Sequence, residues 1–207
     1  MIWKSLLGIL VLLGMMESEN PAFAGEKKLA AATFAGGCFW CMQPPFDNLQ
    51  GVISTEAGYT GGTGEKPTYE EVSSGETGHA EVVRITYDPA RISYSRLLEV
   101  FWKNIDPTTK NRQFADAGTQ YRTAVFYHNE EQKRLALASK ERLEKSGKYA
   151  APIVTEILPA SKFYRGEEYH QFYYKKNPAH YKLYKIGSGR EGYLKRTWGE
   201  TEKRKKP

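Results

Sequence analysis

Short runs in which apolar and polar residues alternate predict a set of β-strands along this 207-residue chain. The clearest run covers residues 80–87, where a period of two places Glu81, Val83 and Ile85 on one face of the strand. Arg84 lies on the opposite face of the same strand. Further strands are predicted at residues 29–34, 51–59, 121–127 and 153–158.

Apolar residues at helical spacing lie between several of these strands. They predict helices at residues 93–104 and 129–147, and Asn129 marks the start of the second one. A tyrosine-rich segment, residues 164–174, is predicted as a further helix that ends before Pro178. Strands and helices alternate without an internal repeat. We therefore expect the α/β (α+β) class, with a mixed β-sheet covered by helices in a single domain.

The first 24 residues differ in character from the rest of the chain. Lys4 precedes an apolar run over residues 6–16, and Ala22-Phe23-Ala24 supplies the small residues typical of an export cleavage site. Because a membrane span needs about 20 apolar residues, we expect residues 1–24 to be a removed signal peptide. An uncleaved anchor is the alternative. Export predicts a periplasmic or extracellular protein in oxidising surroundings, with residues 25–207 forming the single domain.

The chain is basic, with a formal net charge of +6. Much of the excess lies in residues 203–206, within a basic C-terminal tail that begins at about residue 200. We assign this tail no chemistry and expect no nucleic-acid partner, because the chain has no recognisable nucleic-acid module. No second apolar run approaches the length of a bilayer span, so we expect no stable membrane insertion. We also expect a monomer.

Cys38 and Cys41 are the only two cysteines, and they follow Gly36-Gly37 where a predicted strand meets a turn. At this spacing the two thiols share one face of a helix and come close enough to form a disulfide. A helix that begins near Cys38 would also lower the pKa of its thiol. The pair therefore favours redox or nucleophilic chemistry. The alternatives are two buried thiols or a structural disulfide, which would close a very short loop and stabilise the fold little.

Glu81 is a candidate proton donor, because burial beside Val83 and Ile85 would raise the pKa of its carboxyl group. The alternatives are that the face bearing Arg84 is the buried one, or that Glu81 lies at a wet strand end. Tyr69 and Tyr121 lie beside glycine-bearing loops, although packing is the more common role of a tyrosine. The four histidines do not pair with the cysteines at zinc-site spacing, so we expect no metal site.

Several short motifs occur in unbroken order between about residues 34 and 181. They are Gly36-Gly37-Cys38-Phe39-Trp40, Gly58-Tyr59-Thr60-Gly61-Gly62, Pro67-Thr68-Tyr69, Thr77-Gly78-His79-Ala80-Glu81-Val82, Phe101-Trp102 with Asp106-Pro107, Gly118-Thr119-Gln120-Tyr121-Arg122, and Glu168-Tyr169-His170-Gln171 with Asn177-Pro178. This series strongly resembles the A-type peptide methionine sulfoxide reductases. The resemblance implies a two-layer sandwich with a ferredoxin-like core. It also implies an enzyme that reduces the S-epimer of methionine sulfoxide, in proteins or as the free amino acid, to methionine.

The resemblance further implies a role for each matching residue. Cys38 would be the nucleophile and Glu81 the proton donor to the sulfoxide oxygen. Tyr69 and Tyr121 would donate hydrogen bonds to the same oxygen. These roles fit the chemistry, because a thiolate that attacks a sulfoxide needs an acid and hydrogen-bond donors on the oxygen that leaves.

In the same comparison, Phe39 and Trp40 would wall an apolar slot for the substrate methyl group, and Asp116 matches a position that supports the carboxyl site. The chain departs from the better-known pattern, in which resolving cysteines lie in a C-terminal tail, since no cysteine follows Cys41. Our hypothesis is that Cys41 resolves the Cys38 sulfenic acid as a disulfide, which a thioredoxin-like protein then reduces. The alternative is that an external thiol reduces the sulfenic acid directly. No bound cofactor is expected.

Two other functions stay open at the level of the sequence. A general thiol-disulfide oxidoreductase would also carry two cysteines at this spacing at a helix start, and it would not need Glu81. A non-catalytic exported binding module would use its tyrosines and basic tail to hold a partner, and it would not need Cys38.

Overall fold

The computed structural model describes residues 28–203, and the side chains of residues 28–199. The predicted signal peptide therefore lies outside the described residues, as do the side chains of the predicted basic tail. Six strands form one sheet in the order β7-β6-β1-β3-β2-β8, and two short strands pair separately. The strands are β1 (Ala30–Gly36), β2 (Val52–Thr60), β3 (Ala80–Tyr87), β4 (Arg112–Gln113), β5 (Asp116–Ala117), β6 (Thr123–Tyr127), β7 (Glu156–Pro159) and β8 (Tyr164–Arg165).

The sheet is mixed, as the sequence predicts, because β6 and β7 run parallel while the other neighbouring strands are antiparallel. The α-helices are α1 (Phe39–Met42), α2 (Pro44–Asp47), α3 (Tyr69–Ser73), α4 (Tyr94–Trp102), α5 (Glu130–Lys145), α6 (Tyr173–Lys176), α7 (Pro178–Gly187) and α8 (Arg190–Lys203). Short 3-10 helices cover Thr119–Tyr121 and Glu168–His170. This is the α/β architecture of the expected two-layer sandwich.

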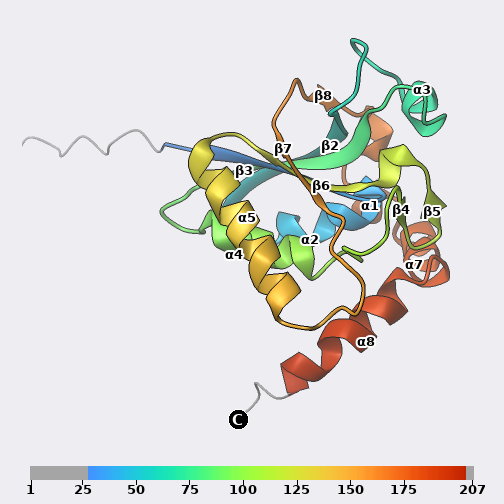
Figure 1. Cartoon of the computed structure of the whole chain (residues 1–207). Coiled ribbons are helices and arrows are strands. Elements are labelled where there is room, and N and C mark those ends of the chain that lie inside the picture. The colour runs from blue at the N-terminus through green and yellow to red at the C-terminus, as the bar shows by residue number, and fades with distance from the viewer. Residues whose placement is uncertain (1–27, 204–207) are drawn as a thin grey trace, which may run out of the picture.

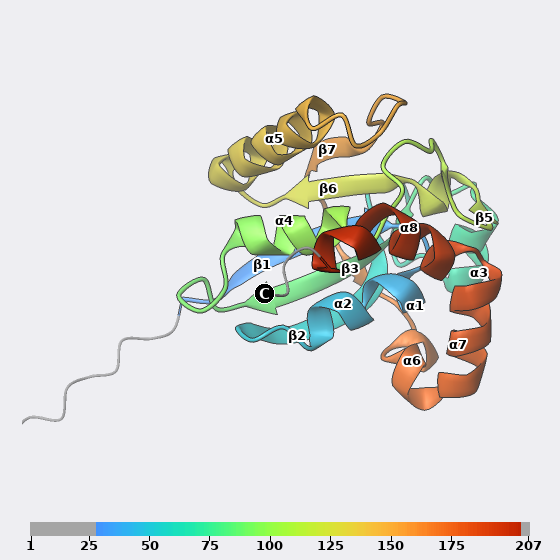
Figure 2. The same ribbon diagram turned by 90° about the horizontal axis from the view of Figure 1, so that it is seen from below.

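One face of the sheet carries the main hydrophobic core. Helices α2, α4 and α5 lie together on this side (Figure 1), and a view turned by 90° shows α1 beside β2 and β3 (Figure 2). Phe34 of β1 is fully buried, and its ring stacks with those of Phe46, Tyr94 and Phe101 at centroid distances of 5.5, 6.1 and 5.0 Å. Aromatic packing from two helices, α2 and α4, therefore holds the first strand in place.

The opposite face has a smaller apolar cluster around Val82 of β3 and Phe126 of β6. The segment between β7 and β8 crosses this face (Figure 1), and its Phe163 packs against the cluster. The sheet thus has one heavily covered face and one lightly covered face. Glu81, Val83 and Ile85 are all buried and belong to the heavily covered side, as the alternation predicts.

The predicted helix over residues 164–174 is wrong. Tyr164 instead pairs with Tyr59 as the edge strand β8, and Phe172 has a φ of +52°, which a helix does not allow. The backbone here is held by Gln171, which is buried and whose side chain donates to the carbonyl groups of Ala57 and Gly166 at 2.9 and 2.8 Å. Tertiary hydrogen bonds therefore replace the helix that the local pattern suggests.

Candidate active site

The cysteine turn begins where β1 ends at Gly36. Gly37 has a φ of +80°, and a Cβ atom at this position would come within 2.5 Å of Gln113 Cβ. Only glycine fits there, because the conformation is left-handed and the space is filled. Cys38 then caps the single turn of α1, with its carbonyl group accepting a hydrogen bond from the Cys41 N–H at 3.0 Å. Both thiols are buried and free.

The expected lowering of the Cys38 pKa is not found. Burial raises the pKa of this thiol well above its usual value, and the charges on Glu81 and Cys41 raise it further. The short helix cannot offset this. Its first N–H, on Phe39, donates to Glu81 rather than to the sulfur, and one turn gives only a small dipole. Burial likewise raises the pKa of Cys41.

Glu81 lies directly beside this turn. The residue is 2% exposed, and its Oε2 atom accepts the hydrogen bond from the Phe39 N–H at 3.0 Å. Burial raises the pKa of the carboxyl group to about 8, while the Phe39 hydrogen bond acts in the opposite direction and the charge on Asp116 adds to the rise. The prediction that this face of β3 is the buried one is therefore confirmed, and the carboxyl group can hold a proton at neutral pH.

Two phenols complete the polar side of the site. Tyr69 is the first residue of α3, which Thr68 caps, and Tyr121 ends the 3-10 helix that follows Gly118. Burial, together with the charges on Glu81 and other neighbours, raises the pKa of Tyr69 to about 12. The pKa of Tyr121 is raised for the same reasons, with burial as the main cause. Both hydroxyl groups therefore keep their protons and can act as hydrogen-bond donors.

Phe39 and Trp40 form the apolar side. The ring of Phe39 is buried against Tyr59 and His170, at centroid distances of 5.9 and 4.8 Å. Trp40 is half-buried, its indole ring stacks on Tyr173 at 3.8 Å, and its N–H donates to His170 Nδ1 at 3.0 Å. The indole is therefore fixed in orientation by one hydrogen bond and one stacking partner.

Asp116 of β5 approaches the same group of residues. It is half-buried, and its Oδ2 atom accepts a hydrogen bond from the Tyr184 hydroxyl at 2.5 Å. Burial raises the pKa of Asp116, while Tyr184 and Arg190 act in the opposite direction. Its charge in turn raises the pKa of Glu81 and of Cys38. The structure therefore brings all the predicted site residues together: Cys38, Cys41, Phe39, Trp40, Tyr69, Glu81, Asp116 and Tyr121.

Sequence reasoning did not single out several residues that support this site. His170 lies within a motif that the resemblance includes, but its bond to Trp40 becomes visible only in the fold. Glu167 accepts hydrogen bonds from the Tyr59 hydroxyl at 2.7 Å and the Tyr69 N–H at 2.8 Å. Tyr184 and Arg190 belong to α7 and α8, two helices that the sequence pattern did not predict. No local signal distinguishes them from surface residues of a helix.

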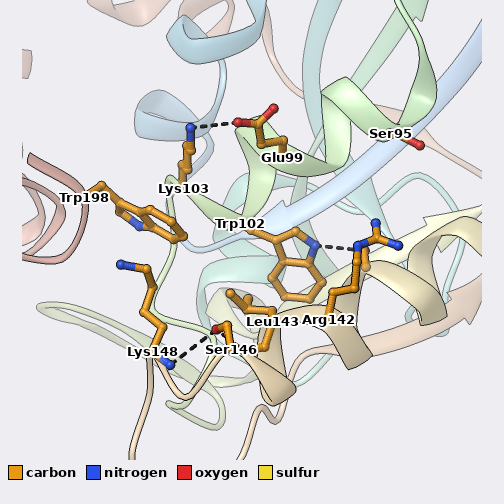
Figure 3. Close-up of a pocket in the computed structure, with 10 residues that line it drawn as sticks. Ser95, Glu99, Trp102, Lys103, Arg142, Leu143, Ser146, Lys148 and Trp198 are labelled. Carbon is orange, nitrogen blue, oxygen red and sulfur yellow. Dashed lines mark hydrogen bonds and ion pairs between the residues drawn. The ribbon is translucent and has the colours of Figure 1, made fainter. Parts of the chain in front are cut away.

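A separate cavity of about 370 Å³ lies between α4, α5 and α8 (Figure 3). It is lined by Trp102, Leu143 and Trp198 together with Lys103, Arg142 and Lys148, among others. None of the site residues lines it.

Within the described part of the chain, no helix is long and apolar enough to cross a membrane. The described residues also contain no cluster of three or more His, Cys, Asp or Glu side chains that could hold a metal ion.

The chain matches known proteins over most of its length. The family model described as peptide methionine sulfoxide reductase matches residues 30–202. The peptide methionine sulfoxide reductase MsrA of Bacillus subtilis is 57% identical over 174 residues, which are 84% of this chain and 98% of the relative. The MsrA of Listeria monocytogenes serotype 4a is 52% identical over 173 residues, which are 84% of this chain and 98% of the relative.

Solved structures agree with this relation. Mxr1 from Saccharomyces cerevisiae in its reduced form is 34% identical and superposes with a TM-score of 0.69, over 73% of this chain and 87% of its own. Methionine sulfoxide reductase A of Corynebacterium diphtheriae is 32% identical with a TM-score of 0.66, over 74% of this chain and 77% of its own. With the buried thiol, the protonated carboxyl group and the aromatic wall already in place, this chain belongs to the peptide methionine sulfoxide reductase family of oxidoreductases.

Proposed function

We propose that this chain reduces the S-epimer of methionine sulfoxide, in proteins or as the free amino acid, to methionine. The observation that carries the proposal is the state of Glu81. Its carboxyl group is buried beside Cys38, and burial raises its pKa to about 8. A carboxyl group with this pKa is about ten parts protonated to one part ionised at pH 7. It can therefore donate a proton at neutral pH.

The first chemical step joins Cys38 to the substrate. The Cys38 sulfur attacks the sulfoxide sulfur while Glu81 protonates the oxygen and Tyr69 and Tyr121 donate hydrogen bonds to it. The sulfur–oxygen bond breaks, the oxygen leaves as water with one proton from Glu81 and one from the thiol, and Cys38 stays bonded to the substrate sulfur as a sulfonium ion. Water then attacks the Cys38 sulfur and breaks the sulfur–sulfur bond, so that methionine leaves, Cys38 carries a sulfenic acid, and the proton released by this water returns to Glu81. The step balances, because a thiol and a sulfoxide give a sulfenic acid and a thioether.

Phe39 and Trp40 supply the binding side of the proposed site. The two residues directly follow Cys38 in the sequence. The ring of Phe39 packs against Tyr59 and His170, and the ring of Trp40 stacks on Tyr173. An apolar wall of this kind binds the methyl group of the substrate, while Glu81, Tyr69 and Tyr121 donate hydrogen bonds to its oxygen. A site that fixes both groups around a chiral sulfur accepts one epimer only.

The second step regenerates the thiol. The Cys41 thiol attacks the sulfenic sulfur, a disulfide forms with Cys38, and water leaves. The nearness of the two residues supports this step, since the Cys41 N–H donates to the Cys38 carbonyl group and ionisation of Cys41 raises the pKa of Cys38. We assign recycling of the disulfide to a thioredoxin-like dithiol protein. For Mxr1 of Saccharomyces cerevisiae, a complex with Trx2 has been solved.

Location and assembly form a separate part of the proposal. The apolar run over residues 6–16 and the small residues at Ala22-Phe23-Ala24 support export after cleavage near residue 24. The enzyme would then repair methionine in periplasmic or extracellular proteins, as a monomer. Sequencing the N-terminus of protein recovered from the expressing cells tests the first point, and light scattering tests the second. A native N-terminus at residue 1 contradicts cleavage.

Turnover of the two epimers tests the reaction. Protein covering residues 25–207 is incubated with the S- or the R-epimer of methionine sulfoxide and a dithiol reductant. The methionine formed is measured by chromatography. We expect turnover of the S-epimer and none of the R-epimer, with complete loss in Cys38→Ser. Comparable turnover of both epimers would contradict the proposed slot. Turnover that survives in Cys38→Ser would contradict the nucleophile.

A further inference from the structure

Tyr184 reaches the proposed active site from α7, a helix that begins 140 residues after Cys38 in the sequence. Its hydroxyl group donates to Asp116 Oδ2 at 2.5 Å. Its ring meets the indole of Trp40 edge-on, with a centroid distance of 5.8 Å and an interplanar angle of 78°. One phenol therefore touches both the supporting carboxylate and the apolar wall of the site.

The position of this phenol is fixed from the other end of α7. Arg190 follows two residues after the C-cap Ser188 and is fully buried, at 2% exposure. Its guanidinium donates to the Gly36 carbonyl group at 2.9 Å and to the Asn104 carbonyl group at 2.6 Å. Gly36 ends the strand that leads into Cys38. The turn after α7 is therefore attached to the same strand end that carries the nucleophile.

The surroundings of the Cys38 sulfur need such a donor. Burial raises the pKa of this thiol, the charges on Glu81 and Cys41 raise it further, and the nearby Tyr184 hydroxyl, which donates to Asp116 in this structure, lowers it. Burial, followed by the charge on Cys38, raises the pKa of Tyr184 above its usual range, so the phenol keeps its proton. The titratable groups that face Cys38 from the surrounding elements are Tyr69, Glu81, Asp116, Tyr121, Tyr181, Tyr184 and Cys41.

We propose that Tyr184 is a further catalytic residue of the reductase, whose hydroxyl shifts its hydrogen bond from Asp116 to the Cys38 sulfur as negative charge develops there. The inference rests on the proposed function and adds a donor on the attacking sulfur to the donors on the leaving oxygen. No covalent bond changes at Tyr184. A hydrogen bond to a charged group of this kind changes an equilibrium by roughly tenfold or more.

The test compares Tyr184→Phe with unchanged protein in a Cys41→Ser background, so that Cys38 is the one thiol. The rate of Cys38 alkylation by chloroacetamide is measured from pH 6 to pH 11. We expect Tyr184→Phe to raise the thiol pKa by about one unit and to slow alkylation at pH 7 about tenfold. The rate of sulfenic acid formation in a single turnover with the S-sulfoxide should fall by a similar factor, with a smaller change in KM.

Tyr174→Phe is the matched control. Tyr174 is also a phenol whose hydroxyl donates to an aspartate, Asp47, but neither residue is among the main groups that shift the pKa of Cys38. We expect its alkylation profile to equal that of unchanged protein. An unchanged thiol pKa in folded Tyr184→Phe, or a loss of turnover without a shift of the alkylation profile, overturns the proposal and leaves Tyr184 with a structural role.

A second variant decides the matter if Tyr184→Phe does not fold. Asp116→Asn speeds alkylation by loss of its charge alone, because that charge raises the pKa of Cys38, so it is compared with Asp116→Asn/Tyr184→Phe, which leaves no buried carboxylate without its donor. The Asp116→Asn protein should alkylate several-fold faster at pH 7 than the double variant, because its Tyr184 hydroxyl can turn to the sulfur. Equal rates in these two proteins overturn the proposal. The alkylation readout needs no substrate. Failure of unchanged protein to form sulfenic acid with the sulfoxide would therefore count against the proposed function, while the alkylation profile still decides the role of Tyr184.

Discussion

Replacing Glu81 by glutamine tests the proton donor directly. The amide oxygen of the new side chain can still accept the Phe39 N–H bond that Oε2 accepts at 3.0 Å, so the cysteine turn keeps its support. The variant therefore removes the proton and little else. General acid catalysis of this kind contributes about 10²–10⁴-fold to a rate. We expect a rate loss of this order at pH 7, with a much smaller change in KM.

The pH dependence of this loss gives a sharper measure. The quantity to plot is the ratio of the single-turnover rate of unchanged protein to that of Glu81→Gln. Ionisation of Cys38 raises the rate of both proteins, and the charge of an ionised Glu81 raises the Cys38 pKa in unchanged protein alone, which lowers the ratio in the same direction as loss of the acid. Below pH 8 Glu81 is protonated and the ratio should stay level. Above its pKa of about 8, Glu81 loses its proton, and the ratio should fall about tenfold for each pH unit.

The assay uses stopped-flow mixing with a methyl sulfoxide and detection of the Cys38 sulfenic acid, from pH 6 to pH 10. Glu56→Gln is the control, because Glu56 forms a partly exposed ion pair with Arg84 at 2.7 Å on the other side of the sheet. Its rate should match that of unchanged protein at every pH. A ratio near one at pH 7, or a ratio that stays level across the whole range, would refute the assignment of Glu81 as the acid.

Three further outcomes are expected. After one turnover without reductant, the intact mass of Cys41→Ser should show one added oxygen, on Cys38. The mass of unchanged protein should instead fall by two hydrogens, because a disulfide forms. The same product from both proteins would remove Cys41 from the mechanism. Because the folded pKa of Glu81, about 8, lies above its usual 4.5, its stability contribution is complete below pH 4.5 and is lost as pH rises through 8. Urea unfolding should show a loss on the order of 5 kcal/mol over that window, which Glu81→Gln lacks. Phe34→Ala should lower the free energy of unfolding by about 3–5 kcal/mol at pH 7, because its fully buried ring leaves a cavity against Phe101.

Local patterns predicted the elements that carry their own signals. The alternation over residues 80–87 matches β3 at both ends, and Ser93 and Asn129 each cap the helix that the sequence places after them. The same alternation put Glu81 on the buried face. These features depend on residues close together in the chain, so the sequence contains enough information to find them.

Features that depend on distant partners were not predictable in this way. Residues 164–174 do not form one continuous helix, because the Gln171 side chain bonds the backbone of β2 more than a hundred residues earlier. The thiol pKa of Cys38 depends on burial and on Glu81, both of which follow from the assembled sheet. Tyr184 and Arg190 act through contacts that no spacing reveals. The sequence therefore predicted the residues that react, such as Cys38 and Glu81, better than the residues that position them, such as Tyr184 and Arg190.

The bond between Arg190 and Gly36 joins residues 154 positions apart, and this separation has a consequence for biosynthesis. On the ribosome, Gly36 and the cysteine turn emerge long before the guanidinium that bonds the Gly36 carbonyl group. Strands β1, β3 and β6 are all translated before that moment. A chain released upstream of residue 190 would thus carry a cysteine turn whose strand end lacks this bond.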